Sequence, residues 1–116
     1  MVVDQLEPQR QEQERVDRIF HALGDTTRRD IVRRVLHGQW SVSALAREYP
    51  MSFAAIQKHV AVLERADLVT KERRGREQLV HPNLQTVRHA AEVLERLEAI
   101  WRGRLQRFED VLGEPD

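Results

Sequence analysis

The sequence contains no cysteine and few aromatic residues, and each absence excludes a class of protein. Without cysteine the chain has no disulfide, no thiolate metal site and no thiol redox switch. Aromatic residues make up 5% of the chain and charged residues 33%, a composition that favours helices over a β-sandwich or barrel. The first residues show neither the basic nor the apolar region of a signal peptide, so we expect none, and no apolar run is near the roughly 20 residues that cross a bilayer. We therefore expect a cytoplasmic protein with no membrane association.

The charges balance overall but are distributed unevenly along the chain. Residues 1–25 hold three basic and six acidic side chains, a net charge of −3. Residues 26–82 hold eleven and six, a net charge of +5, and residues 83–116 hold five and seven, a net charge of −2. A basic middle between acidic ends is typical of a protein with a local nucleic-acid-binding surface.

The length of 116 residues fits one domain. Residues 1–8 are polar and end in Pro8, so we expect a flexible N-terminus, followed by a single domain over residues 9–116. A first helix is predicted over residues 9–23, because Val16, Ile19 and Phe20 form an apolar stripe at helical spacing.

Two more helices follow, each with start and stop signals. Residues 25–27 offer side-chain oxygens that cap the second helix, and Thr27 and Asp30 have the spacing of a capping box. Ser41 opens a short third helix. Pro50 must end it, since proline disfavours helical geometry in the residue before it.

A fourth helix begins at Ser52, only a few residues after the third, and this spacing is typical of a helix-turn-helix. In that motif the second helix lies in the DNA major groove and presents its N-terminal residues to the bases. The predicted exposed residues at this end are Ser52, Phe53, Ala54, Gln57 and Lys58. The alternative is a solvated helix face that binds nothing.

These side chains suit contacts to DNA. Gln57 can pair with adenine through two hydrogen bonds, and Lys58 can reach guanine or a phosphate. Phe53 or Ala54 can touch a thymine methyl group, and the helix N-terminus at Ser52 suits a phosphate. His59 lies on the same helix, where we expect a structural or DNA-proximal role rather than metal binding.

A basic hairpin follows the fourth helix. Short strand-like runs over residues 68–72 and 77–80 surround a turn at residues 73–76. The predicted DNA contacts of this wing are Lys71, Arg73, Arg74 and Arg76, which would bind phosphates or enter the minor groove. The alternative is an ordinary charged turn, since Glu72 and Glu77 offset part of the charge.

The last predicted helix, over residues 84–112, is too long for one small domain to cover. Its apolar residues recur every three or four positions along about 40 Å. We therefore expect the first and last helices to pack against a second copy in a homodimer. The predicted interface residues are Val16, Ile19, Phe20, Leu94, Leu97, Trp101, Leu105 and Phe108. We expect the aromatic residues among them to pack in this interface, since aromatic residues at helical spacing more often form a core than a ligand-binding site.

The chain resembles the ArsR-type winged helix-turn-helix regulators over residues 16–112. The resemblance rests on FHALGDTTRRDIVRRVL (20–36), SVSALA (41–46), MSFAAIQKHVAVLERADLV (51–69), the Gly75 wing and HPN (81–83). It implies a mainly α fold with a small β-hairpin wing between the fourth and fifth helices. It also implies dimerisation through the first and last helices, and repression at an inverted-repeat operator near the regulator's own or an adjacent gene.

The sequence departs from the metal-sensing members of that family. Residues 44–48, where those members carry thiolate ligands on the third helix, hold none. His89 and Glu92 on the last helix form at most half of the ligand set expected there. We therefore predict no metal and no cofactor, and the resemblance is to the subgroup that does not sense metals.

Two functions from different classes fit these observations. The first is a sequence-specific DNA-binding regulator, most simply a dimeric repressor. The second is a winged-helix module that binds an acidic protein partner. We do not expect an enzyme, because the sequence has no cysteine, no phosphate-binding loop and no nucleophile–base arrangement.

Overall fold

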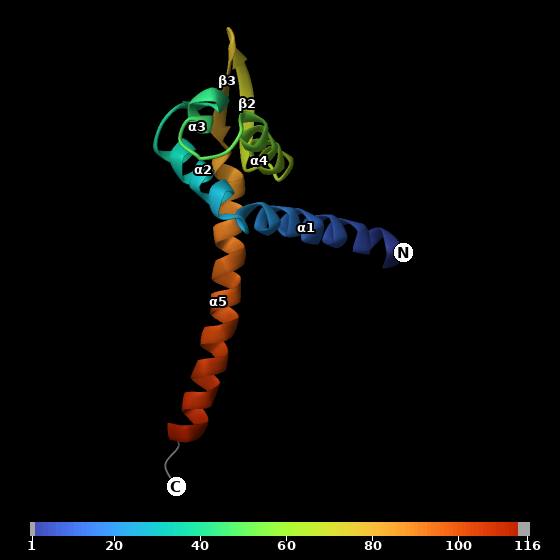
Figure 1. Cartoon of the computed structure of the whole chain (residues 1–116). Coiled ribbons are helices and arrows are strands. Elements are labelled where there is room, and N and C mark those ends of the chain that lie inside the picture. Colours follow the sequence, from blue (N-terminus) through green and yellow to red (C-terminus); the bar gives the residue numbers. More distant parts are fainter. Residues whose placement is uncertain (1, 114–116) are drawn as a thin grey trace.

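The computed structural model describes residues 2–113, which form five helices and three short strands. In chain order they are α1 (Val2–Leu23), α2 (Thr26–His37), β1 (Trp40–Ser41), α3 (Val42–Ala46), α4 (Phe53–Arg65), β2 (Val69–Arg74), β3 (Glu77–Pro82) and α5 (Leu84–Gly113). Elements α2 to β3 form a head, from which α1 and α5 project in different directions (Figure 1). This arrangement confirms the predicted mainly α fold with a β-hairpin wing.

The sheet has one strand more than the sequence indicated. Its strand order is β1-β3-β2, and all neighbours are antiparallel. Strand β1 consists only of Trp40 and Ser41, which pair with Val80 and Leu79. Two residues carry no periodic pattern, so this strand could not be found from the sequence.

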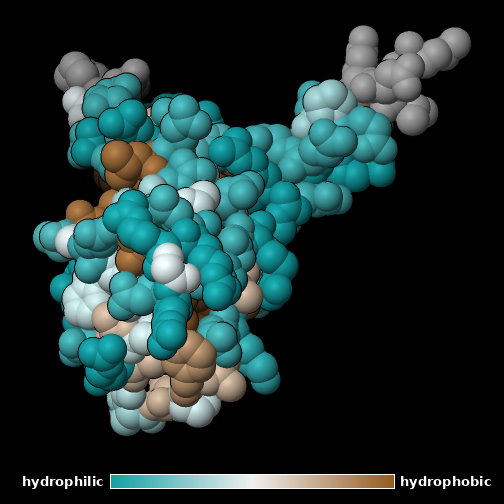
Figure 2. Space-filling model, turned by 90° about the horizontal axis from the view of Figure 1, so that it is seen from above, coloured by the Kyte–Doolittle hydropathy of each residue, from teal (hydrophilic) through white to brown (hydrophobic). Residues whose placement is uncertain are grey.

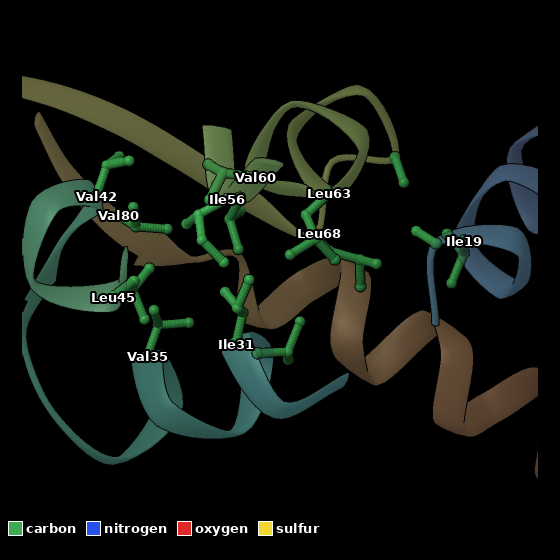
Figure 3. Packing of buried hydrophobic residues seen from close by; sticks show 14 of the residues in the cluster. Ile19, Ile31, Val35, Val42, Leu45, Ile56, Val60, Leu63, Leu68 and Val80 are labelled. Carbon is green, nitrogen blue, oxygen red and sulfur yellow. The ribbon is translucent and has the colours of Figure 1, made fainter. Parts of the chain in front are cut away.

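The core of the head joins all of its elements (Figure 3). Ile31 of α2, Leu45 of α3 and Ile56 of α4 are fully buried, and Val80 of β3 is nearly so. Ile19 of α1 is also fully buried in this cluster. Burial of each such side chain contributes about 1.5–3 kcal/mol to the free energy of folding. The cluster therefore fixes α4 and the base of the wing relative to each other.

Side-chain caps begin α2, α3 and α4. Asp25 accepts a hydrogen bond from the Arg28 amide at 3.0 Å, Ser41 from the Ala44 amide at 3.0 Å, and Ser52 from the Ala55 amide at 3.1 Å. The predicted capping box of Thr27 and Asp30 is wrong, because Asp25 caps α2 and leaves Asp30 inside the helix.

Helix α1 begins earlier than predicted. It starts at Val2 rather than at residue 9, and Pro8 lies inside it. Proline removes one backbone hydrogen bond, which weakens a helix at that point but does not always end it. An i,i+3 ion pair between Glu7 and Arg10, at 3.6 Å, crosses this position. The structure therefore extends the first helix over residues 2–8.

The turns on either side of β2 set the direction of the wing. After α4, Asp67 adopts a left-handed conformation with φ 60°, and the Leu68 amide donates to the Leu63 carbonyl at 3.0 Å. This is the Schellman pattern of helix ends. At the wing tip only Gly75 and Arg76 lie between the paired residues Arg74 and Glu77. Gly75 has φ 64°, which glycine adopts at little cost.

The projecting helices make the molecule elongated. Its extents are 72 × 42 × 21 Å, and its radius of gyration is 19.6 Å, against about 13 Å for a compact domain of this size. None of the helices described over residues 2–113 combines the length and apolarity needed to span a bilayer.

Candidate nucleic-acid interface

Helix α4 turns one face to the core and the other to solvent. Ile56, Val60 and Leu63 are buried on the inner face. The residues predicted to contact DNA are all exposed: Ser52, Phe53, Ala54, Gln57 and Lys58. Phe53, at the first position of the helix, is 46% exposed. The structure therefore brings these five residues together at the exposed N-terminal end of α4.

His59 lies differently from the other residues predicted to contact DNA. Its Nδ1 accepts a hydrogen bond from Arg28 at 3.3 Å and lies 3.8 Å from the Asp25 carboxylate. The ring therefore contacts the start of α2, so of the two predicted roles the structural one fits. Its contacts with Arg28 and Asp25 fit the structural role, and its assignment as a DNA contact stays a prediction.

Arg28 extends this contact to α1. Its guanidinium donates to the carbonyls of Ala22 at 2.8 Å and His21 at 3.2 Å, at the end of that helix. The hydrogen bond from the Arg28 amide lowers the pKa of Asp25. Arg28 and Asp25 thus tie α1, α2 and α4 together, a role that the sequence did not reveal.

A second polar cluster holds the turn between α3 and α4. Tyr49 donates from its hydroxyl to Asp30 of α2 at 2.6 Å, and Arg34 donates to the same carboxylate at 2.8 Å. The Arg34 guanidinium lies 5.3 Å from the centre of the Trp40 ring and 5.5 Å from that of the Tyr49 ring. It also lies 3.7 Å from Glu48. We call Asp30, Arg34 and Tyr49 the turn clamp.

The ionisation of the turn clamp follows from these contacts. Hydrogen bonds from Tyr49, Arg34 and Arg33 hold the pKa of Asp30 well below its ordinary value. Burial and the hydrogen bond to Asp30 raise the pKa of Tyr49 to about 12. Asp30 is therefore an anion and Tyr49 a neutral donor across the physiological range.

The basic residues of the wing fall into two groups. Lys71 lies 3.3 Å from Glu64 of α4, and Arg74 lies 3.2 Å from Glu72. Glu72 also accepts from His81 at 2.8 Å, and this bond, together with the charge of Arg74, lowers the pKa of Glu72. These pairs use part of the charge that the sequence assigned to DNA.

Arg73 and Arg76 form the second group. Both are exposed, and within residues 2–113 neither lies in an ion pair; the same holds for Lys58 of α4. Seen from the wing end, the molecule has a mainly hydrophilic surface (Figure 2). Of the residues predicted to contact DNA, Lys58, Arg73 and Arg76 are thus exposed cations without a carboxylate partner in the described part of the chain.

His89, which with Glu92 forms at most half of a metal ligand set, contacts α1. His89 donates from Nε2 to Glu12, and its Nδ1 lies 3.9 Å from Glu92. Within the described part of the chain, no group of three or more histidine, aspartate or glutamate residues is arranged to hold a metal ion.

The predicted interface residues on α5 are all exposed. They are Leu94, Leu97, Trp101, Leu105 and Phe108, with exposed fractions between 43% and 62%. On α1, Val16 and Phe20 are half-buried. The assignment of Ile19 to the interface is wrong, because its side chain is fully buried in the core of one chain.

Comparisons with known proteins were made by sequence and by structure. No protein-family model matches the chain. The chain is 49% identical over 53 residues to the HTH-type transcriptional regulator Rv2034 of Mycobacterium tuberculosis, and that match spans half of the relative's length. It is 43% identical over 67 residues to YuzN, an uncharacterized HTH-type transcriptional regulator of Bacillus subtilis, of which the match covers 73%.

The decisive similarity is to a solved structure. An ArsR-like transcriptional regulator from Rhodococcus sp. RHA1 superposes with a TM-score of 0.74 and 31% identity, over 86% of this chain and 94% of that one. The chain belongs to the ArsR family. It is accordingly a transcriptional regulator with a helix-turn-helix DNA-binding fold, and not an enzyme.

A further ArsR-family neighbour shows how widely the fold is shared. The homodimeric winged helix-turn-helix domain of a possible ArsR-family regulator from Mycobacterium bovis superposes with a TM-score of 0.62 and 23% identity, over 74% of this chain and 81% of that one. At this identity the likeness concerns the fold alone. The site residues therefore depend on the geometry described above.

Proposed function

We propose that this ArsR-family chain binds double-stranded DNA by placing the N-terminal end of α4 in the major groove. The observation that carries the proposal is the cluster of Ser52, Phe53, Ala54, Gln57 and Lys58 at the exposed end of α4, opposite its buried face. Gln57 reads an adenine edge, Lys58 reaches guanine or a phosphate, and Phe53 or Ala54 meets a thymine methyl group.

The wing supplies contacts that do not depend on sequence. Arg73 and Arg76 have no acidic partner in the described part of the chain, so their charges are available to phosphates or to the minor groove. Arg74 shares this surface but lies 3.2 Å from Glu72, and Lys71 is paired with Glu64. Lys71 and Arg74 therefore contribute less to binding than Arg73 and Arg76.

We further propose that two copies form a homodimer through α1 and α5. Exposed apolar side chains run along α5 from Leu94 to Leu112, and large exposed apolar surfaces on a single chain mark interfaces. Leu97 is 57% exposed and Trp101 55% exposed, so a second copy would remove a large apolar area from water. The homodimeric M. bovis domain indicates that the fold is compatible with this assembly.

A dimer with two identical reading heads matches a DNA site with two-fold symmetry. We therefore propose an inverted-repeat operator, and repression of the regulator's own or an adjacent promoter, in accordance with the family resemblance. No inducer is proposed.

The proposal is tested by selecting duplexes from a random pool with the purified protein. We expect an enriched inverted repeat, and binding that weakens steeply as salt rises, since phosphate contacts release counterions. A protein-interaction module would enrich no sequence. Recovery of only single, unpaired half-sites would contradict the dimer but not DNA binding.

A further inference from the structure

The turn between α3 and α4 is tied to α2 through two consecutive residues. Tyr49 donates to Asp30 at 2.6 Å, and Glu48 lies 3.7 Å from Arg34, which itself donates to Asp30 at 2.8 Å. The Met51 amide donates to the Tyr49 carbonyl at 2.8 Å, so the backbone after the clamp is also folded tightly. Ser52, the cap of α4, follows directly.

We propose that Tyr49 and Arg34 are positioning residues for DNA reading, because they fix the turn from which the exposed end of α4 emerges. This inference rests on the proposed DNA-binding function and deepens it. None of the clamp residues needs to touch DNA. Their role is to hold Phe53, Ala54 and Gln57 in one orientation relative to the head.

The geometry of Arg34 explains why the clamp is rigid. Its planar guanidinium lies over the Trp40 ring and over the Tyr49 ring, with centroid distances of 5.3 and 5.5 Å. A guanidinium combines such stacking with directed hydrogen bonds to a carboxylate, which an ammonium group cannot do. Arg34 thus contacts α2, β1 and the turn at the same time.

The other anchors of α4 lie further along the helix. His59 contacts Arg28, and Val60 and Leu63 pack on the core, so the C-terminal half of α4 is held independently of the clamp. In the first turn of α4 only Ile56 is buried, so loss of the clamp would loosen the exposed side of this turn, which carries the candidate base contacts. This separation makes the role of the clamp testable without unfolding the head.

The chain offers a matched control for Arg34. Its neighbour Arg33 pairs with the same Asp30 carboxylate but has a more exposed side chain, 61% against 25%, and within residues 2–113 it forms no hydrogen bond or ring contact with the turn. Arg33→Gln and Arg34→Gln therefore remove the same charge from adjacent positions. Tyr49→Phe removes only the hydroxyl and keeps the ring beside Arg34.

The test measures binding to a duplex selected from a random pool by the wild-type protein, and to a scrambled duplex. Arg34→Gln and Tyr49→Phe should each bind the selected duplex roughly fivefold to tenfold more weakly, in line with the net contribution of about one ordinary hydrogen bond. Tyr49→Phe should leave binding to scrambled DNA, and the dependence of binding on salt, unchanged. Arg33→Gln should behave as the wild type in its preference for the selected duplex over scrambled DNA.

Amide hydrogen exchange without DNA gives an independent readout. In Tyr49→Phe, the amides of residues 51–56 should exchange faster, while those of Val60 and Leu63 keep wild-type protection. The positioning role is overturned if Arg34→Gln and Tyr49→Phe lose no more sequence preference than Arg33→Gln, or if the turn amides keep wild-type exchange. If the wild-type protein selects no duplex, the proposed function fails, and the exchange comparison alone decides whether the clamp holds the turn.

Discussion

At the scale of single residues, Gln57 is the side chain on α4 best suited to read a base. It is exposed, follows the cap of the helix by five positions, and can form two hydrogen bonds to adenine. Gln57→Ala should weaken binding to a selected operator by about 1–3 kcal/mol and relax the preference at one position in each half-site. Binding isotherms on operator and scrambled DNA check this, with Gln85→Ala on α5 as a control that should change neither.

Substitutions of Arg73 or Arg76 should affect DNA binding differently from Gln57→Ala. Replacing either with glutamine removes a cation that we propose to contact phosphate, so all duplexes should bind more weakly by similar factors. The slope of the logarithm of affinity against the logarithm of salt concentration should fall by roughly one for each phosphate that a subunit no longer neutralises. Arg10→Gln removes the same charge from α1, far from the wing in the chain, and should leave the slope unchanged. Loss of base preference in the wing variants would contradict this division of roles.

Tyr49 is the only tyrosine of the chain, so its ionisation can be followed directly by ultraviolet absorbance. The hydroxyl should lose its proton near pH 12 rather than near pH 10, since burial and Asp30 raise its pKa to about 12. A group whose pKa is higher in the folded state stabilises the fold below its unfolded pKa. We therefore expect this contribution to stability to decline between about pH 10 and pH 12. Titration with a midpoint near 10 in the folded protein would contradict the contact.

At the scale of elements, the exposed apolar face of α5 is the proposed dimer interface. Leu97→Glu places a charge on this face and should convert the dimer to a folded monomer, because an unpaired carboxylate is costly to bury. Leu36→Glu is the matched control, since Leu36 is an exposed leucine of α2, outside the proposed interface. Analytical ultracentrifugation compares the two. A dimer in both variants would show that α5 is not the interface.

Patterns along the sequence predicted the long elements better than the contacts between them. The stripes of α4 and α5 and the caps Ser41 and Ser52 have local signals, and the structure confirms these elements. The partners of Asp30 and His59 lie elsewhere in the chain, so their hydrogen bonds follow from the tertiary fold and not from spacing. Ile19 shows the same limit, because an apolar stripe does not say whether it faces the chain's own core or a second copy.

At the scale of the whole molecule, α1 and α5 separate the proposed reading head from the proposed interface. The head ends near Ala90, the last buried residue of α5, and the exposed apolar face begins at Leu94. In a two-fold dimer, the distance between the two α4 helices therefore depends on how these projecting helices cross. Inverted half-sites about one helical turn apart, roughly 34–36 Å, are the expected spacing.

Because α5 is one continuous helix from the head to the proposed interface, its length should determine the distance between the two half-sites of the operator. Each residue of a helix adds about 1.5 Å and a rotation of about 100°, so one alanine inserted after Ala91 would turn each head out of phase with its partner. Seven inserted residues complete nearly two turns and restore the angle, but they move each head outward by about 10 Å. Duplex selection should thus recover no inverted repeat with the single insertion and a repeat of altered spacing with the longer one. The number of residues between the head and the interface, and not any side chain that touches DNA, would then set which spacing the regulator accepts.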